Sequence, residues 1–356
     1  MLKYFKYRIP FKKPFKTAVG HFSHREGIYL MYEADGVQAF GEVAPLPGFS
    51  DEKLNDVQVV LKQNRKYIEE ALKNDNATQV FSILSQIHNF PSLDFGLSTL
   101  VHDLKAKQNE VPLAKYLFDE YAEEIQCNGT IGLQDYDTAI DSAKRIVQSG
   151  FKTIKVKVGD NFENEKMILS SIRKLFPELK IRIDANQSWD VKEAITNLNQ
   201  LSELNIEYCE QPVSALNNSD LREVKENTSI KIAADESIRN KEQAIKLIQE
   251  NCCDVMILKP ALIGDFKSLF VTKEVADTHN IYTVITTSLD GIIGRITTAI
   301  LVSGLNINMY GHGLATGNLL DEVGVGSENI ENGSYFLPKV NGIGSPIDLT
   351  YFEELH

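Results

Sequence analysis

The pattern of apolar and polar residues along the chain changes near residue 125. Before it, KYFKYRIPF and IYLMYEADGVQAFGEVAPL alternate apolar with polar positions. Asp35 and Gly36 stand between two such runs, which is the strongest short signal for a β-hairpin. Apolar residues at helical spacing follow in DEKLNDVQVVLKQNRKYIEEAL and FGLSTLVHDLKAKQ. Residues 1–124 therefore predict an α+β module.

After residue 125, short β-rich runs alternate with amphipathic helical stretches, a pattern typical of parallel βα units. Eight candidate strands recur, namely IQCNGTIG, FKTIKVKVG, KIRIDANQ, IEYCEQP, IKIAADES, DVMILKP, YTVITTS and NINMYGHGL. An open doubly wound sheet is the alternative, but no GxGxxG or GxxxxGK[ST] turn follows any of these runs.

The pattern predicts an α/β fold, a modified (β/α)8 TIM-like barrel over residues 125–320. An α+β capping domain, built from residues 1–124 and the C-terminal tail, is expected beside it. Residues 321–356, with the irregular stretch SYFLPKVNGIGSPIDL, are expected to pack back onto that domain.

Composition narrows the classes of partner. With 356 residues, 43% of them hydrophobic, and a formal net charge of −12, the chain can bury a large core and disfavours nucleic acid or an anionic membrane as a partner. No apolar run approaches the roughly 18 residues of a membrane span. These features predict a cytoplasmic protein with a small-molecule partner. Without a heptad seam, the oligomeric state stays open.

Four cysteines, Cys127, Cys209, Cys252 and Cys253, show neither zinc-site spacing nor a disulfide framework. Three of them sit beside apolar strand or helix signals. Buried, reduced thiols are therefore the expectation.

Two lysines are expected inside the barrel. In FKTIKVKVG the apolar residues Ile154, Val156 and Val158 alternate with Lys155 and Lys157. If the apolar set faces the surrounding helices, both ammonium groups point into the barrel. A solvated edge strand would explain this segment taken alone. The neighbouring candidate strands favour the interior position.

Acidic residues end three consecutive candidate strands. IRIDAN places Asp184 and Asn186 inward, IEYCEQP ends near Glu210, and IKIAADES ends in Asp235 and Glu236. A single acid at such a turn would more often cap a helix. Three in succession, at the barrel end where active sites lie, predict a catalytic site.

Three converging carboxylates require a hard cation among them, and oxygen ligands suit Mg²⁺, with Mn²⁺ as the alternative ion. DVMILKP places Lys259 across the barrel from Lys157. The set favours abstraction of a proton next to a substrate carboxylate, with Lys157 as the base. We expect Lys155 and the dication to lower the pKa of Lys157.

These residues resemble the muconate-lactonizing-enzyme subgroup of the enolase superfamily. The motifs that carry the likeness are KVK at 155–157, DAN at 184–186, EQP at 210–212, DES at 235–237 and LKP at 258–260. The resemblance implies that Asp184, Glu210 and Asp235 bind the metal. It also implies that Lys157 and Lys259 flank the substrate.

Within this subgroup, GEVAPLPGFS, TSLDGIIGR and GHGLATGNLL are similar to segments of o-succinylbenzoate synthases. That likeness implies Mg²⁺-dependent syn dehydration of 2-succinyl-6-hydroxy-2,4-cyclohexadiene-1-carboxylate to 2-succinylbenzoate, on the route to menaquinone or phylloquinone. Ser288 and the backbone near Gly313 are then expected to contact the substrate. The segment TAVGHFSHR and Phe49 are expected to close over it.

Two alternatives stay open. The same scaffold would serve an N-succinylamino acid racemase or a dipeptide epimerase, with the two lysines acting from opposite faces. Dipeptide epimerases often carry a DxD pair near the last strand, which GHGLATGNLL lacks. A catalytically silent carboxylate-binding protein could also keep the barrel, although all five catalytic positions are filled.

Overall fold

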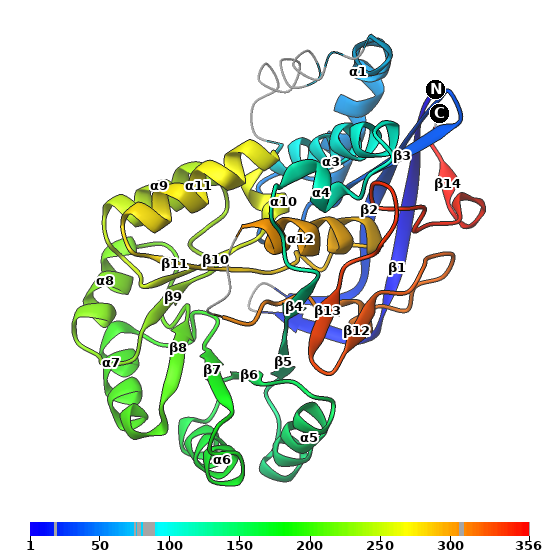
Figure 1. The fold of residues 1–356 in the computed structure, drawn as a ribbon. Coiled ribbons are helices and arrows are strands. Elements are labelled where there is room, and N and C mark those ends of the chain that lie inside the picture. Colours follow the sequence, from blue (N-terminus) through cyan, green and yellow to red (C-terminus); the bar gives the residue numbers. More distant parts are fainter. Residues whose placement is uncertain (18–19, 75, 77–79, 81–89, 306–309, 356) are drawn as a thin grey trace.

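An antiparallel sheet forms the capping part of the molecule (Figure 1). The computed structural model describes the chain except for residues 18–19, 75, 77–79, 81–89, 306–309 and 356. The sheet has the order β14-β1-β2-β3, from Glu353–Glu354, Leu2–Thr17, Gly20–Ala34 and Val37–Val43. Asp35 and Gly36 have φ values of 52° and 77°. Two positive values suit the type I′ turn of the predicted hairpin.

Helix α3 (Pro91–Gln108) is buried along most of its length because it lies between this sheet and the barrel (Figure 1). A Cβ atom on Gly41 of β3 would stand 2.2 Å from the carbonyl oxygen of Gly96, so glycine permits this close approach. The helices α1 (Leu54–Lys73) and α4 (Leu113–Leu117) also lie on the capping side.

Seven parallel strands form the curled sheet of the barrel, and each pairs with the next along the chain. They are β5 (Asn128–Ile131), β6 (Thr153–Lys157), β7 (Lys180–Asp184), β8 (Ile206–Glu210), β9 (Ile232–Ala234), β10 (Val255–Leu258) and β11 (Tyr282–Ile285).

The helices that follow these strands lie outside the sheet (Figure 1). They are α5 (Tyr136–Gln148), α6 (Phe162–Leu175), α7 (Val191–Gln200), α8 (Asn218–Glu226), α9 (Lys241–Gln249), α10 (Pro260–Ile263), α11 (Phe266–Thr278) and α12 (Ile292–Gly304). Short 3₁₀ turns span Ser202–Leu204, Gly317–Leu319 and Leu349–Tyr351. The predicted combination of a capping domain and a modified barrel is confirmed.

The ring closes through a short extended segment. Of the predicted eighth strand NINMYGHGL, residues 306–309 lie outside the described residues. His312 pairs with the chain before β5, through its N–H to the Gln126 oxygen at 2.8 Å. The Gly313 N–H bonds to the Ile285 oxygen at 3.2 Å. His312 and Gly313 therefore form isolated bridges on both sides, and residues 310–314 are not the regular strand expected.

The first predicted barrel strand, IQCNGTIG, is divided at Cys127. Residues Glu124–Gln126 form β4, which pairs antiparallel with β13 (Ser334–Phe336), and β13 also pairs with β12 (Asn329–Glu331). Only β5 enters the barrel. The C-terminal segment thus contacts both parts of the molecule, because β14 pairs with β1. The domain limits at residues 124 and 320 stay predictions.

The structure bears on two features of the sequence, the membrane-spanning potential of its helices and the state of its cysteines. Among the helices of the described residues, none is both long and apolar enough to cross a membrane. All four cysteines are buried and in no disulfide, as predicted.

The capping sheet is joined to the barrel by two buried side chains. Glu42 of β3 accepts hydrogen bonds from the Tyr7 hydroxyl at 2.6 Å and from the N–H groups of Gly291 and Gly294 at 2.6 and 2.8 Å. Both glycines stand at the start of α12, where free N–H groups and the helix dipole favour an acidic partner. Glu42 therefore holds β3 against this helix.

Arg25 of β2 makes a second joint through hydrogen bonds to main-chain oxygens. Its guanidinium donates to Leu289 O at 3.1 Å on the barrel side. It donates to Pro45 O at 2.7 Å and to Ala44 O on the capping side. These bonds hold the segment after β3 next to the turn after β11.

Replacing Glu42 with alanine should lower the free energy of unfolding by about 2–4 kcal/mol, because it leaves three buried donors without an acceptor. Urea unfolding at pH 7 measures the loss. An unchanged midpoint would show that Glu42 does not join the two parts.

The stability that Glu42 contributes should depend on pH. Burial, with a smaller contribution from Asp290, raises the pKa of Glu42 to about 7. Because the folded pKa is raised above the ordinary value, the contribution is complete below pH ~4.5 and falls as the pH rises through 7. Between pH 5 and 8 the free energy of unfolding of the wild type should fall by up to about 3 kcal/mol more than that of Glu42→Gln. Parallel stability curves would contradict this.

Candidate active site

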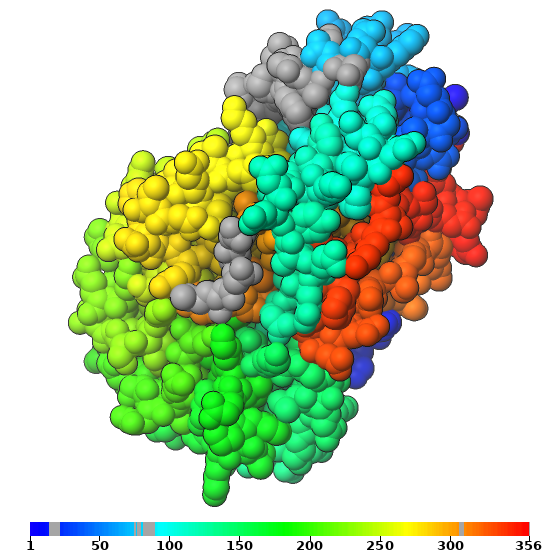
Figure 2. All heavy atoms as spheres, viewed as in Figure 1, coloured from blue at the N-terminus to red at the C-terminus, as the bar shows by residue number. Residues whose placement is uncertain are grey.

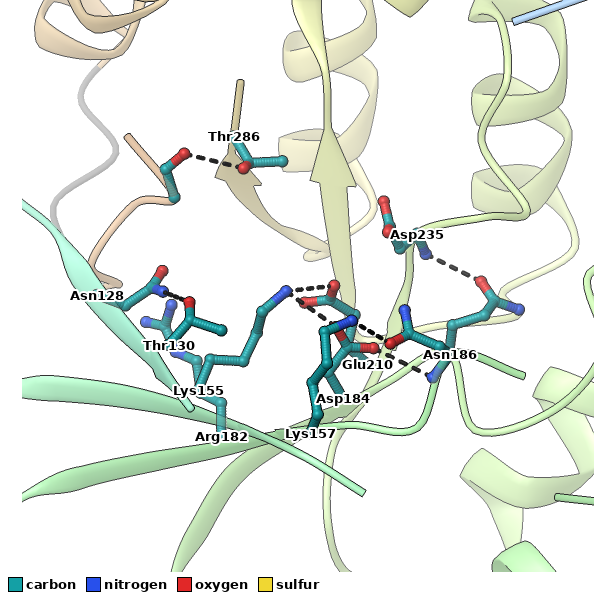
Figure 3. Close-up of polar contacts among 12 residues, drawn as sticks. Asn128, Thr130, Lys155, Lys157, Arg182, Asp184, Asn186, Glu210, Asp235 and Thr286 are labelled. Carbon is teal, nitrogen blue, oxygen red and sulfur yellow. Dashed lines mark hydrogen bonds and ion pairs between the residues drawn. The ribbon is translucent and has the colours of Figure 1, made fainter. Parts of the chain in front are cut away.

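The register of β6, β7 and β8 brings the predicted charged residues to one level. Lys157 stands beside Asp184, and Asp184 stands beside Glu210. All three lie at the carboxyl ends of parallel strands, and their side chains point toward one another (Figure 3). The alternation predicted for β6 holds, since Ile154 and Val156 are buried on the other face.

Lys155 is bonded to two of the carboxylates. Its Nζ lies 2.8 Å from Glu210 Oε1 and 3.1 Å from Asp184 Oδ2. Burial by itself would lower the pKa of Lys155, but Asp184, Glu210 and Asp235 together raise it well above its ordinary value. Lys155 is therefore a charged partner of the carboxylates. This is a more direct role than the effect on Lys157 that the sequence suggested.

Asp184 and Glu210 are both buried, but the positive charge of Lys155 affects their pKa values differently. Burial raises the pKa of Glu210 to about 7, and the nearby Asp184 adds to the rise. At Asp184 burial acts in the same direction, but Lys155 and Lys157 together lower the pKa below its ordinary value. Asp184 is thus the better stabilised anion. Further positive charge would stabilise the ionised form of Glu210 more than that of Asp184.

Asp235 and Lys259 form the opposite side of the site. Asp235 follows the end of β9, Lys259 follows the end of β10, and their side chains form an ion pair. The Phe49 ring centroid lies 4.9 Å from Lys259 Nζ. Phe49 comes from the segment after β3, so the capping side reaches the barrel mouth. That Phe49 closes over the substrate stays a prediction.

The predicted convergence of three carboxylates is only partly present. Asp184 and Glu210 meet at Lys155, whereas Asp235 is turned to Lys259 and stands apart from them in Figure 3. Within the described parts of the chain, no three acidic, histidine or cysteine side chains are close enough together to enclose an ion. The three carboxylates are nevertheless buried at one end of adjacent strands and are hard oxygen donors. Their chemistry fits Mg²⁺.

Gln211 was not singled out from the sequence, yet it fixes the turn that carries Asp235. It is fully buried and has a φ of 37°. Its Oε1 accepts from the Asp235 N–H at 2.9 Å and from the Ser237 N–H at 3.2 Å. Its Nε2 donates to Val213 O at 3.0 Å and to Ser237 Oγ at 2.9 Å. The EQP motif contained this residue, but nothing in its spacing indicated these partners.

Asn186 and Glu236, both predicted as supporting residues, lie side by side at the mouth. Lys157 Nζ donates to Asn186 Oδ1, and Asn186 Nδ2 donates to Glu236 Oε1 at 3.0 Å. Burial, then the charges of Asp235 and Asp184, raise the pKa of Glu236 to about 8.

Ser288 and Gly313 are tied into the protein. Ser288 is 1% exposed, and its N–H donates to Asp290 Oδ2 at 2.8 Å. The Gly313 N–H and carbonyl both pair with the end of β11, and a Cβ there would stand 2.3 Å from Thr286 Oγ1. Gly313 thus helps to close the barrel. Substrate contact by either residue stays a prediction.

The segment TAVGHFSHR was expected to be a loop over the substrate. Residues 18–19 of this segment lie outside the described residues, and Gly20–Ala34 is strand β2. Residues 20–25 are therefore part of a long hairpin with β1 and not of a loop. Strand pairing extends further here than the sequence indicated, because β1 continues to Thr17.

Comparison with curated proteins finds relatives below 30% identity that span most of the chain. One is an L-Ala-D/L-Glu epimerase of Clostridium acetobutylicum, 27% identical and aligned over 91% of this chain and 97% of the relative. Another is an L-Ala-D/L-Glu epimerase of Francisella tularensis subsp. novicida, 28% identical over 82% of this chain and 83% of the relative.

Solved structures share the fold. Muconate lactonizing enzyme from Pseudomonas fluorescens, complexed with muconolactone, matches with a TM-score of 0.88 and 22% identity, over 99% of this chain and 98% of that one. The dipeptide epimerase from Enterococcus faecalis, complexed with Mg and L-Leu-L-Tyr, matches with a TM-score of 0.86 and 24% identity, over 96% and 98%.

Two family models match different parts of the chain. The MenC N-terminal domain model matches residues 1–104, and the enolase C-terminal domain-like model matches residues 138–351, more than half of the chain. Together with the lysines and carboxylates at the barrel mouth, these matches show that the protein is an enzyme of the enolase superfamily.

Proposed function

We propose that the protein is an o-succinylbenzoate synthase that dehydrates 2-succinyl-6-hydroxy-2,4-cyclohexadiene-1-carboxylate to 2-succinylbenzoate. The observation that carries the reaction class is the position of Lys157 and Lys259. Lys157 ends β6 and Lys259 directly follows β10, four strands apart in a ring that residues 311–313 complete, so the two lysines face each other across the carboxylates. The MenC N-terminal domain match supports this substrate.

The lysines have distinct parts in this reaction. Lys157, as the neutral amine, takes the proton next to the substrate carboxylate and then gives it to the departing hydroxide on the same face of the ring. A C–H bond and a C–O bond break, a C=C bond completes the aromatic ring, and water leaves. Lys259, as the ammonium, stabilises the developing negative charge from the other face.

Asp184, Glu210 and Asp235 are the residues that would hold Mg²⁺. When bound there, the ion would neutralise the substrate carboxylate and make the adjacent proton more acidic. Lys155 keeps Asp184 and Glu210 side by side through its two bonds. Phe49 covers Lys259 from the capping side and limits its contact with water.

Dipeptide epimerisation is the second candidate, because the similar curated relatives include epimerases. A dipeptide carries an ammonium group that needs an anionic partner, whereas the proposed synthase substrate carries two carboxylates and no ammonium. Residues 310–320, YGHGLATGNLL, contain no Asp or Glu. This part of the mouth therefore suits the synthase substrate better.

Magnesium should stabilise the folded protein through Glu210. At a concentration of 100 times Kd, Mg²⁺ should add about 2.7 kcal/mol, read as a rise in melting temperature. Glu210→Gln should abolish the rise. Glu207→Gln is the matched control on the same strand, because Glu207 pairs with Arg182 and Lys180 away from the other carboxylates. An equal rise in Glu210→Gln would refute Glu210 as a ligand.

Lys157→Ala should reduce kcat for aromatisation by at least ~10³-fold while the fold is kept. The half-exposed Lys180, at the start of β7, offers a control, and Lys180→Ala should stay within about twofold of the wild type. The assay follows product absorbance with Mg²⁺ and again after EDTA. Normal turnover by Lys157→Ala would show that Lys157 is not the base. Epimerisation of L-Ala-L-Glu by the wild type without any aromatisation would replace the synthase with the second candidate.

A further inference from the structure

Asn186 occupies a turn that directs its side chain over the barrel mouth. Its φ is 43°, in the left-handed region that Asn adopts more readily than most residues. Its N–H donates to Asp184 Oδ1 at 3.2 Å. Gln187, with a φ of 68°, holds the next part of the turn by accepting from the Ala215 N–H at 2.9 Å. The turn thus has a defined conformation, and its asparagine meets Lys157 (Figure 3).

The two ends of the Asn186 amide have different partners. Oδ1 accepts from Lys157 Nζ, and Nδ2 donates to Glu236 Oε1 at 3.0 Å. An N–H of Lys157 donates to Oδ1, and the carboxyl oxygen of Glu236 accepts from Nδ2. Both neighbours therefore require the same orientation of the amide. If the amide were turned over, both contacts would be lost.

Glu236 is a carboxyl group buried at an energetic cost. It is 2% exposed, and within the described residues its Oε2 has no hydrogen-bond partner. Burying a carboxyl group with an unpaired oxygen costs free energy, and a leucine would fill similar space at less cost. Among the described residues, the Glu236 carboxyl group accepts a hydrogen bond from Asn186 and also feels the charges of Asp235, Asp184 and Lys259. This bond links it to the proposed base.

We propose that Asn186 and Glu236 are positioning residues for Lys157. Asn186 Oδ1 orients the Lys157 amine toward the substrate, and Glu236 fixes the direction of the Asn186 amide. The inference rests on the proposed function, in which Lys157 is the base. Lys259 is held by its ion pair with Asp235 and covered by Phe49. Its charge also acts on Glu236, but the hydrogen bonds that run from Glu236 through Asn186 lead to Lys157.

Variants of Glu236 separate an acceptor from a space-filling group. Glu236→Leu keeps the bulk but cannot accept from Asn186, and should reduce kcat for aromatisation by about 10–100-fold with KM within about twofold. Glu236→Gln can still present an oxygen to Asn186, and should lose much less. A Glu236→Leu enzyme with wild-type kcat, or a Glu236→Gln enzyme as impaired as Glu236→Leu, would overturn the proposal.

A double-mutant cycle tests whether Glu236 acts through Asn186. Asn186→Gly removes the amide but tolerates the left-handed backbone. If the proposal holds, adding Glu236→Leu to Asn186→Gly lowers kcat by less than about twofold, because the partner of Glu236 is already absent. Independent, multiplicative losses would show that Glu236 acts by another route.

A measurement that needs no turnover keeps this inference separate from the proposed function. Hydrogen exchange of the Asn186 side-chain amide can be followed by NMR, with the signal assigned from its absence in Asn186→Gly. Exchange should be at least tenfold faster in Glu236→Leu than in the wild type and Glu236→Gln. Equal exchange in all three would overturn the positioning role. A wild type that fails to aromatise the substrate would instead overturn the proposed function and leave this result to stand.

Discussion

Acidic side chains that crowd one end of a closed barrel repel one another unless positive charge lies among them. In this protein Lys155 supplies that charge for Asp184 and Glu210, and Lys259 supplies it for Asp235. The side chains around these groups follow from the same requirement. Gln211 fixes the turn of Asp235, and Asn186 accepts a hydrogen bond from the Lys157 side chain. These ion pairs and hydrogen bonds keep several buried charged groups in place at one end of the barrel.

The site also depends on two parts of the chain that are distant in sequence. Figure 2 shows the first residues, the middle of the chain and the C-terminal segment packed into one continuous surface. Glu42 holds β3 against α12, and the segment that follows β3 carries Phe49 to Lys259. A base supplied by the barrel and an apolar cover supplied by the capping side thus meet at one point. Neither part alone presents the complete mouth.

Much of this arrangement could be predicted because strands alternate their side chains regularly. The parity of FKTIKVKVG placed Lys155 and Lys157 inside, and the ends of successive strands placed the acids together. What could not be predicted depends on contacts between distant turns. Gln211 bonds to a turn more than 20 residues away, and Cys127 interrupts a strand because its neighbours pair with β13. The ion pair of Asp235 likewise depends on side-chain rotation that alternation does not specify.

Arg25 connects the capping side to the barrel with a chemistry that differs from the charged pairs of the mouth. Its partners are the main-chain oxygens of Ala44, Pro45 and Leu289, which every amino acid possesses. Substitutions in these segments can therefore alter the side chains around the mouth while the joint itself is kept. A scaffold joined in this way can acquire a new substrate by changing its lining residues, without first having to rebuild the contact that holds its two parts together.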